Sequence, residues 1–141
     1  ISIRRCWRKR RRIGAMGETD IISLYIETAL ELERLDNIKT ATRATSNAIV
    51  RKHNKLADKL IKIAIEVNTD YPHKKEDFFR LLYHENKTVR DWVRFQIIDN
   101  VDYDYAHRKE AMKSILEYKK EMGKLWFKMW LDYHPECREL L

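Results

Sequence analysis

The densest group of side chains that could bind a metal or move a proton is the run Asp102-Tyr103-Asp104-Tyr105-Ala106-His107. On a helix, Asp104 and His107 would share a face at i, i+3, a spacing that occurs in metal sites. The run lacks the second carboxylate–histidine pair of a helical di-metal centre, and it lacks the glycine and closing glutamate of a calcium loop. We therefore expect Asp104 to cap a helix and His107 to be a surface side chain.

The other histidines are scattered, and no HExxH or nucleophile-elbow motif surrounds them. They are His53, His73, His84 and His134. The glycines, Gly14, Gly17 and Gly123, cannot form a Gly-rich phosphate loop. We predict no cofactor, no metal and no enzymatic activity.

The two cysteines, Cys6 and Cys137, stand at opposite ends of the chain without a CxxC pair or a disulfide framework. This usage is typical of a reducing compartment. No apolar run after the first arginines is long enough for the core of a signal peptide. The sequence therefore predicts a cytoplasmic protein.

A basic stripe recurs at helical spacing in the first half of the chain and consists of Arg51, Lys55, Lys59 and Lys62. The preceding segment carries Glu27, Glu31 and Asp36, which antiparallel packing would bring close enough for ion pairs. Two interpretations stay open: a solvated helix face, or an interface for an acidic partner. We treat the stripe as a candidate interface.

The C-terminal segment is the most apolar part of the sequence, with Trp126, Phe127, Met129, Trp130, Leu131 and Tyr133 on nearly every side of two helical turns. It is too short to cross a bilayer, which takes about 20 residues. Either this helix fills the core, or it presents a dimer or partner interface. The candidate interface residues are Trp126, Met129 and Trp130.

These side chains must be positioned by helices, because apolar residues recur at three and four throughout and no segment alternates as a strand. The first helix is predicted from about Thr19 to Leu35, with a cap at Thr19 or Asp20. Asp36-Asn37 is predicted to be a polar turn. A second helix then extends from Ile38 to Val67, long or bent near His53-Asn54.

Pro72 is predicted to end that helix and to open the next turn. Two short helices follow, one over 75–83 and one capped by Thr88. A further helix runs from Asp104 to a C-terminal cap at Gly123, before the aromatic segment.

The segment Leu81-Leu82-Tyr83-His84-Glu85-Asn86-Lys87-Thr88-Val89-Arg90-Asp91-Trp92 resembles a group of small bacterial helical domains that is catalogued only as a domain of unknown function. The looser resemblance extends over about 22–116. The pair of short helices is also similar to a single HEAT repeat. The resemblance implies that Arg90 ties the loop together, while the spacing predicts a buried Trp92 and an Arg94 that contributes little to folding.

The net charge of +7 arises entirely in residues 1–15, which hold seven of the 29 bases and no acid. Residues 16–141 carry 22 bases against 22 acids and are neutral. We interpret 1–15 as a disordered tail, either an upstream extension of the reading frame or an artificial addition. Two other functions of the tail stay open: an arm that binds RNA or DNA, and a nuclear-targeting or membrane-surface segment.

The sequence predicts an all-α protein in which residues 16–141 form a single domain, an antiparallel array of about five to six helices with a HEAT-like hairpin. We expect a non-enzymatic module that binds another protein or a second copy of itself, of the inhibitor or immunity kind, and no membrane association. The alternative is a nucleic-acid-associated protein that uses the basic N-terminal arm.

Overall fold

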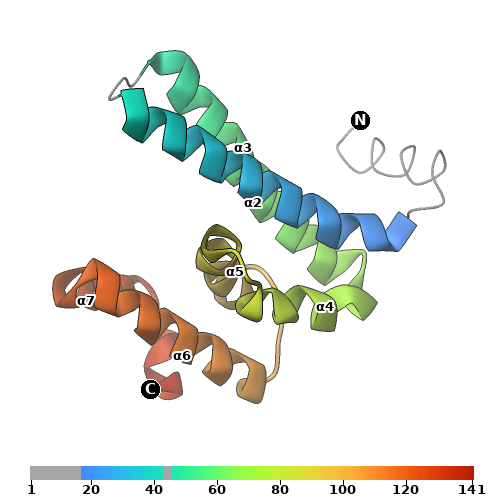
Figure 1. Ribbon diagram of the computed structural model, residues 1–141. Helices are drawn as coiled ribbons and strands as arrows, with labels where there is room; N and C mark the ends of the chain where they lie inside the picture. The colour runs from blue at the N-terminus through green and yellow to red at the C-terminus, as the bar shows by residue number, and fades with distance from the viewer. Residues whose placement is uncertain (1–16, 43–45) are drawn as a thin grey trace. The chain divides into compact units, whose positions relative to one another are not determined.

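The computed structural model describes residues 17–42 and 46–141, and within these the protein is all α-helical with no strand (Figure 1). The expected all-α class is therefore confirmed. The basic tail of residues 1–15, including Cys6, lies outside the described residues. The chain forms two compact units, the first ending at Phe78 and the second spanning Phe79–Leu141.

The first unit is built on an antiparallel hairpin of α2 (Gly17–Thr42) and α3 (Asn47–Thr69) (Figure 1). Each helix buries an apolar stripe at spacings of three and four, as the periodicity predicts. From α2 the buried residues include Ile21, Tyr25, Ala29 and Leu32, and from α3 Leu56, Leu60, Ile63 and Val67. Burial of these side chains holds the hairpin together.

The turn between these helices is not at Asp36-Asn37, so that prediction was wrong. α2 continues to Thr42, and α3 begins after Ser46, whose hydroxyl accepts a hydrogen bond from the backbone N–H of Ile49 at 3.2 Å. Asn37 is exposed, and a polar residue on the solvent side of a helix does not end it. α3 also runs without a break through His53-Asn54.

Short elements follow α3: η1 (Pro72–Lys74), α4 (Lys75–Phe79) and η2 (Arg80–Tyr83). Pro72 stands in the first turn of η1, as predicted. The helix expected over 75–83 is therefore an α-helical turn that tightens into a 3₁₀-helix. The ring of Phe78 meets Tyr25 of α2 edge-on, with centroids 4.9 Å apart.

The second unit consists of η2, α5 (Lys87–Asp99), α6 (Tyr105–Met122), α7 (Lys124–Tyr133) and η3 (Pro135–Leu140). Its core comprises Val89, Val93, Ile97, Ala111, Met112, Ile115, Phe127 and Leu140. Gly123 ends α6 with a φ of +96°, which an L side chain rarely adopts, so the predicted C-cap is confirmed. No helix in the described part of the chain is long and apolar enough to cross a membrane.

Candidate functional site

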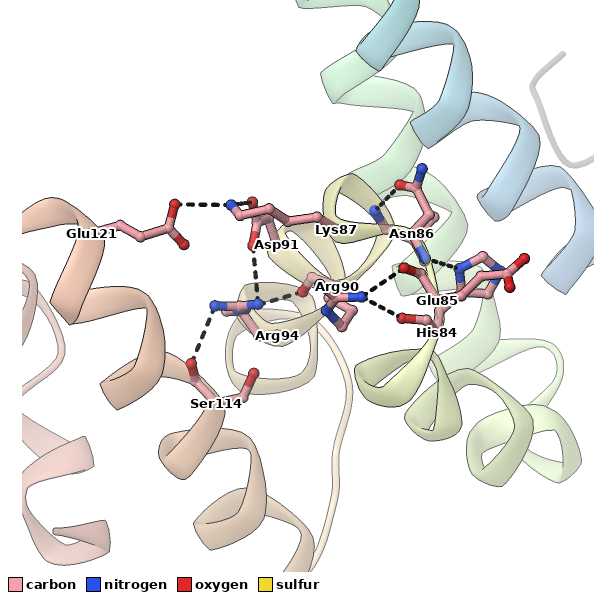
Figure 2. Close-up of polar contacts among 10 residues, drawn as sticks. His84, Glu85, Asn86, Lys87, Arg90, Asp91, Arg94, Ser114 and Glu121 are labelled. Atoms are coloured by element: carbon pink, nitrogen blue, oxygen red, sulfur yellow. Dashed lines mark hydrogen bonds and ion pairs between the residues drawn. The ribbon is translucent and has the colours of Figure 1, made fainter.

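The turn before α5 is held by side chains of its own segment (Figure 2). Asn86 is the N-cap, because its side-chain oxygen accepts a hydrogen bond from the N–H of Val89 at 3.1 Å; the expected cap at Thr88 was wrong. Arg90 Nη1 donates to the carbonyl oxygens of His84 at 2.7 Å and Glu85 at 2.9 Å. Arg90 thus ties the loop together in the way the resemblance implies.

Arg94, which the sequence predicts to contribute little to folding, is buried and only 6% exposed. Its guanidinium donates to the carbonyl oxygens of Arg90 at 3.1 Å and Ser114 at 3.2 Å, and it lies 3.0 Å from Asp91 Oδ1 (Figure 2). It also lies over the ring of Tyr118, 5.0 Å from the centroid. Desolvation lowers the pKa of Arg94, an effect that Asp91 opposes. Arg94 therefore joins α5 to α6.

Trp92, expected to be buried, is half-buried. Val89, Val93 and Ile97 form the buried stripe of α5, and Trp92 stands at its edge. The sequence therefore predicted the buried stripe of α5 correctly, but it wrongly counted Trp92 as one of the buried residues.

Lys87 extends the polar network along α5 and α6. Its ammonium lies 2.7 Å from Asp91 Oδ2 and 3.0 Å from Glu121 Oε1. The hydrogen bond to Asp91 is the main reason that the pKa of Lys87 is raised. Positive and negative groups in this network are thus matched to one another.

A pocket of about 330 Å³ lies against this network and is lined by Leu82, Tyr83, Arg90, Arg94, Glu110, Lys113, Ser114 and Glu117. Tyr83 donates a 2.6 Å hydrogen bond to Glu110 across it. Desolvation and then this bond raise the pKa of Tyr83 to about 12, so the phenol stays neutral at physiological pH. Within the lining, Tyr83 binds Glu110 and Arg94 binds the carbonyl oxygens of Arg90 and Ser114, so these contacts link η2 and α5 to α6.

Asp104 and His107 form the predicted helix cap. Asp104 Oδ1 accepts hydrogen bonds from the backbone N–H of His107 at 2.9 Å and from its Nδ1 at 2.6 Å. The backbone bond is the main reason that the pKa of Asp104 is lowered. His107 is half-buried and meets the ring of Phe79 at 4.5 Å, so it is less exposed than expected.

Two of the remaining histidines contact carboxylates. His53 is 3.5 Å from Asp36, and His134 is 2.9 Å from Asp99 while stacking on Trp130 at 4.3 Å. Within residues 17–42 and 46–141, no three His, Cys, Asp or Glu side chains group as metal ligands. Burial raises the pKa of the Cys137 thiol to about 11, which makes it a poor nucleophile.

The aromatic side chains of α7 divide between two faces. Trp126 and Trp130 are half-buried and meet the edge of Phe95, with centroids 6.0 and 6.1 Å apart. Phe127 is buried. The inward half of the C-terminal segment is therefore core, one of the two interpretations left open by the sequence.

The outward half of α7 is an exposed apolar stripe. Leu125 is 72% exposed, Met129 53% and Tyr133 82%, at spacings of four, and Met122 precedes them at the end of α6. Of the predicted interface residues, Met129 alone lies in this stripe. The spacing of residues 125, 129 and 133 is present in the sequence. Because the rest of the helix is equally apolar, the sequence did not indicate which face would be exposed. We call Met122, Leu125, Met129 and Tyr133 the α7 stripe.

The basic stripe Arg51, Lys55, Lys59 and Lys62 is exposed along α3. The expected ion pairs with α2 are made by other bases: Lys52 lies 3.6 Å from Glu31, and His53 lies near Asp36. Among the described residues, none of the four stripe cations forms an ion pair. The hairpin thus leaves these four charges to solvent.

Comparison with known proteins adds no family: no family model matches the chain, and no curated protein or solved structure is significantly similar to it.

Proposed function

We propose that this protein is a non-enzymatic interaction module that binds another protein chain through the α7 stripe. The observation that carries the proposal is the exposure of Leu125, Met129 and Tyr133 at i, i+4 and i+8 of one helix. Apolar side chains aligned in this way gain free energy when a partner covers them, and Met and Tyr are frequent in the centres of protein interfaces.

A rigid support makes this face suitable for binding. Beside the stripe on α7, Trp126 and Trp130 are held against Phe95. The ring of His134 stacks on Trp130 at the end of α7, and its two nitrogens lie 2.9 Å from Asp99 Oδ1 and from the carbonyl oxygen of Trp130. A preorganised face loses little conformational entropy on binding. The resemblance of the α5 region to a HEAT-like hairpin, a class that mostly binds macromolecules, supports the same proposal.

The occupant is either a second copy or a different protein, and cross-linking distinguishes them. A photoreactive amino acid replaces Tyr133 in cells of the source organism, and the same amino acid at Tyr83, exposed in the same unit, is the control. We expect one discrete adduct from position 133 and none from position 83. An adduct of twice the chain mass identifies a homodimer.

Met129→Glu in the cross-linking chain tests whether the stripe itself binds. An uncompensated carboxylate in a desolvated interface is costly, so the adduct should disappear while circular dichroism stays unchanged. Leu141→Glu, an exposed apolar residue outside the stripe, is the matched control and should leave the adduct intact. An adduct that survives Met129→Glu, or no adduct at all from position 133, overturns the proposal.

A further inference from the structure

The outer face of α3 concentrates positive charge that the fold does not neutralise. Arg51, Lys55, Lys59 and Lys62 lie within three helical turns, about 17 Å of helix axis. Two acids of α2, Glu31 and Asp36, lie against Lys52 and His53 and not against the four cations. Asp58 is the one acid within residues 51–62, so the four cations of the stripe outnumber the negative charge of this segment.

An apolar ridge runs beside the cations on the same helix. Ile61 is 36% exposed and Ile65 42%, one turn apart, and Val50 is exposed further along α3. At 100° per residue, Ile61 and Ile65 lie on one edge of the outer face, the cations on the other edge, and Asp58 between the two edges. A partner that fits this face must supply both negative charge and apolar side chains.

We propose that the outer face of α3 binds an acidic amphipathic helix of another protein, with carboxylates opposite the cations and aliphatic side chains over Ile61 and Ile65. Nucleic acid would match the cations alone, because a phosphate backbone makes no favourable contact with isoleucine. Proteins that hold single strands usually stack bases on aromatic rings, and α3 carries no Phe, Tyr or Trp. The amphipathic helix matches both edges of the face.

The test uses the full-length chain and a fluorescein-labelled synthetic helix of about 18 residues with Leu at i, i+4 and Glu beside them. The control is a scrambled peptide of identical composition. The charge of residues 1–15 attracts both peptides equally, so the difference between them reports a face that recognises an amphipathic helix, and the variants below show whether that face is on α3. By fluorescence anisotropy, we expect the amphipathic peptide to bind at least about ten-fold more tightly than the scrambled one.

Two double variants then separate the edges of the face. Lys55→Glu with Lys62→Glu reverses charge, and Ile61→Ser with Ile65→Ser removes the ridge without changing charge; each should weaken binding at least about ten-fold while the helical signal remains. Lys113→Glu with Lys128→Glu, exposed cations of the second unit, should change binding by less than about two-fold. Met129→Glu should leave binding of the peptide unchanged. The result for the outer face of α3 is therefore independent of the result for the α7 stripe.

Four results would overturn the proposal. The scrambled peptide binds as tightly as the amphipathic one, or the isoleucine variant binds like the unaltered chain. An oligothymidylate displaces the peptide, and it binds the lysine variant more weakly but the isoleucine variant as tightly as the unaltered chain. The face would then be a nucleic-acid site. Vesicles rich in phosphatidylglycerol bind through the same residues while the peptide does not, which makes it a lipid-binding face.

Discussion

Arg94 shows how much one long side chain contributes to this protein. It is the buried cation that joins α5 to α6, with Asp91, Tyr118 and the carbonyl oxygen of Ser114 around its guanidinium. Removal of Arg94 would leave the carbonyl oxygen of Ser114 without this donor and Asp91 with Lys87 as its remaining ion-pair partner. Arg94 therefore stabilises the second unit by satisfying buried polar groups of α5 and α6.

Arg94→Ala is expected to lower the free energy of unfolding by about 3 kcal/mol, since the hydrogen bond to Ser114 and the contact with Tyr118 would be lost together with one of the two cations that pair with Asp91. Lys113→Ala, an exposed cation of the same pocket, should change it by less than about 0.5 kcal/mol. Urea unfolding followed by circular dichroism measures both. Equal midpoints for the two variants would mean that Arg94 adds nothing to the stability that Lys87 already gives Asp91.

The buried hydroxyl of Tyr25, unlike the guanidinium of Arg94, has no hydrogen-bond partner in the described part of the chain. Desolvation raises the pKa of Tyr25 well above its usual value. Tyr25→Phe should therefore leave stability unchanged or raise it by about 1 kcal/mol at neutral pH.

The advantage of Tyr25→Phe should grow in alkali. Above about pH 10 the unfolded chain releases the phenolic proton while the folded protein retains it, so stability from Tyr25 is present below this pH and is lost as the pH rises. Urea midpoints at about pH 8 and about pH 10.5 test the sign. A difference between the proteins that stays constant between these pH values would contradict the raised pKa of Tyr25.

At the scale of elements, single capping residues determine where the helices begin and end. Ser46 starts α3, Asn86 starts α5, Asp104 starts α6 and Gly123 ends it. Each cap satisfies backbone groups that the helix itself leaves open, or supplies a backbone angle that other residues avoid. These residues fix where each amphipathic face begins, and with it which side chains reach the core.

Asn86→Ala should destabilise the protein by about 1 kcal/mol, because the N–H of Val89 loses its acceptor. Thr88→Ala, two residues further into α5, should cost less than about 0.5 kcal/mol. Thermal unfolding of the two variants side by side separates the observed cap from the one expected from sequence. A larger loss for Thr88→Ala would place the start of α5 elsewhere.

At the scale of the whole molecule, charge is divided unequally along the chain. Residues 1–15 carry +7, and the rest is neutral overall. Local surfaces within that neutral part still differ in sign, as the outer face of α3 demonstrates. Net charge is therefore a poor guide to which part of this protein meets a partner.

A chain that begins at Met16 is expected to keep its melting temperature within about 2 °C and to lose its retention on a cation-exchange resin. The physical reason is that residues 1–15 have no periodic apolar face and carry charges of one sign. Calorimetry and elution in a salt gradient measure the two effects. A marked drop in melting temperature would show that Ile3, Trp7 or Ile13 contributes to the core.

The all-α class, the buried stripes around Ile63 and Val89, and the caps at Asp104 and Gly123 were predictable from the sequence, because helical periodicity and capping act over a few neighbouring residues. The sequence also marked the aromatic segment and the basic stripe. Only the tertiary structure decided that Arg94 is buried, since its partner carbonyl belongs to Ser114, 20 residues away on another helix. It likewise decided which side of α7 faces Phe95 and which side remains exposed, because a helix that is apolar all round carries no local signal of its orientation.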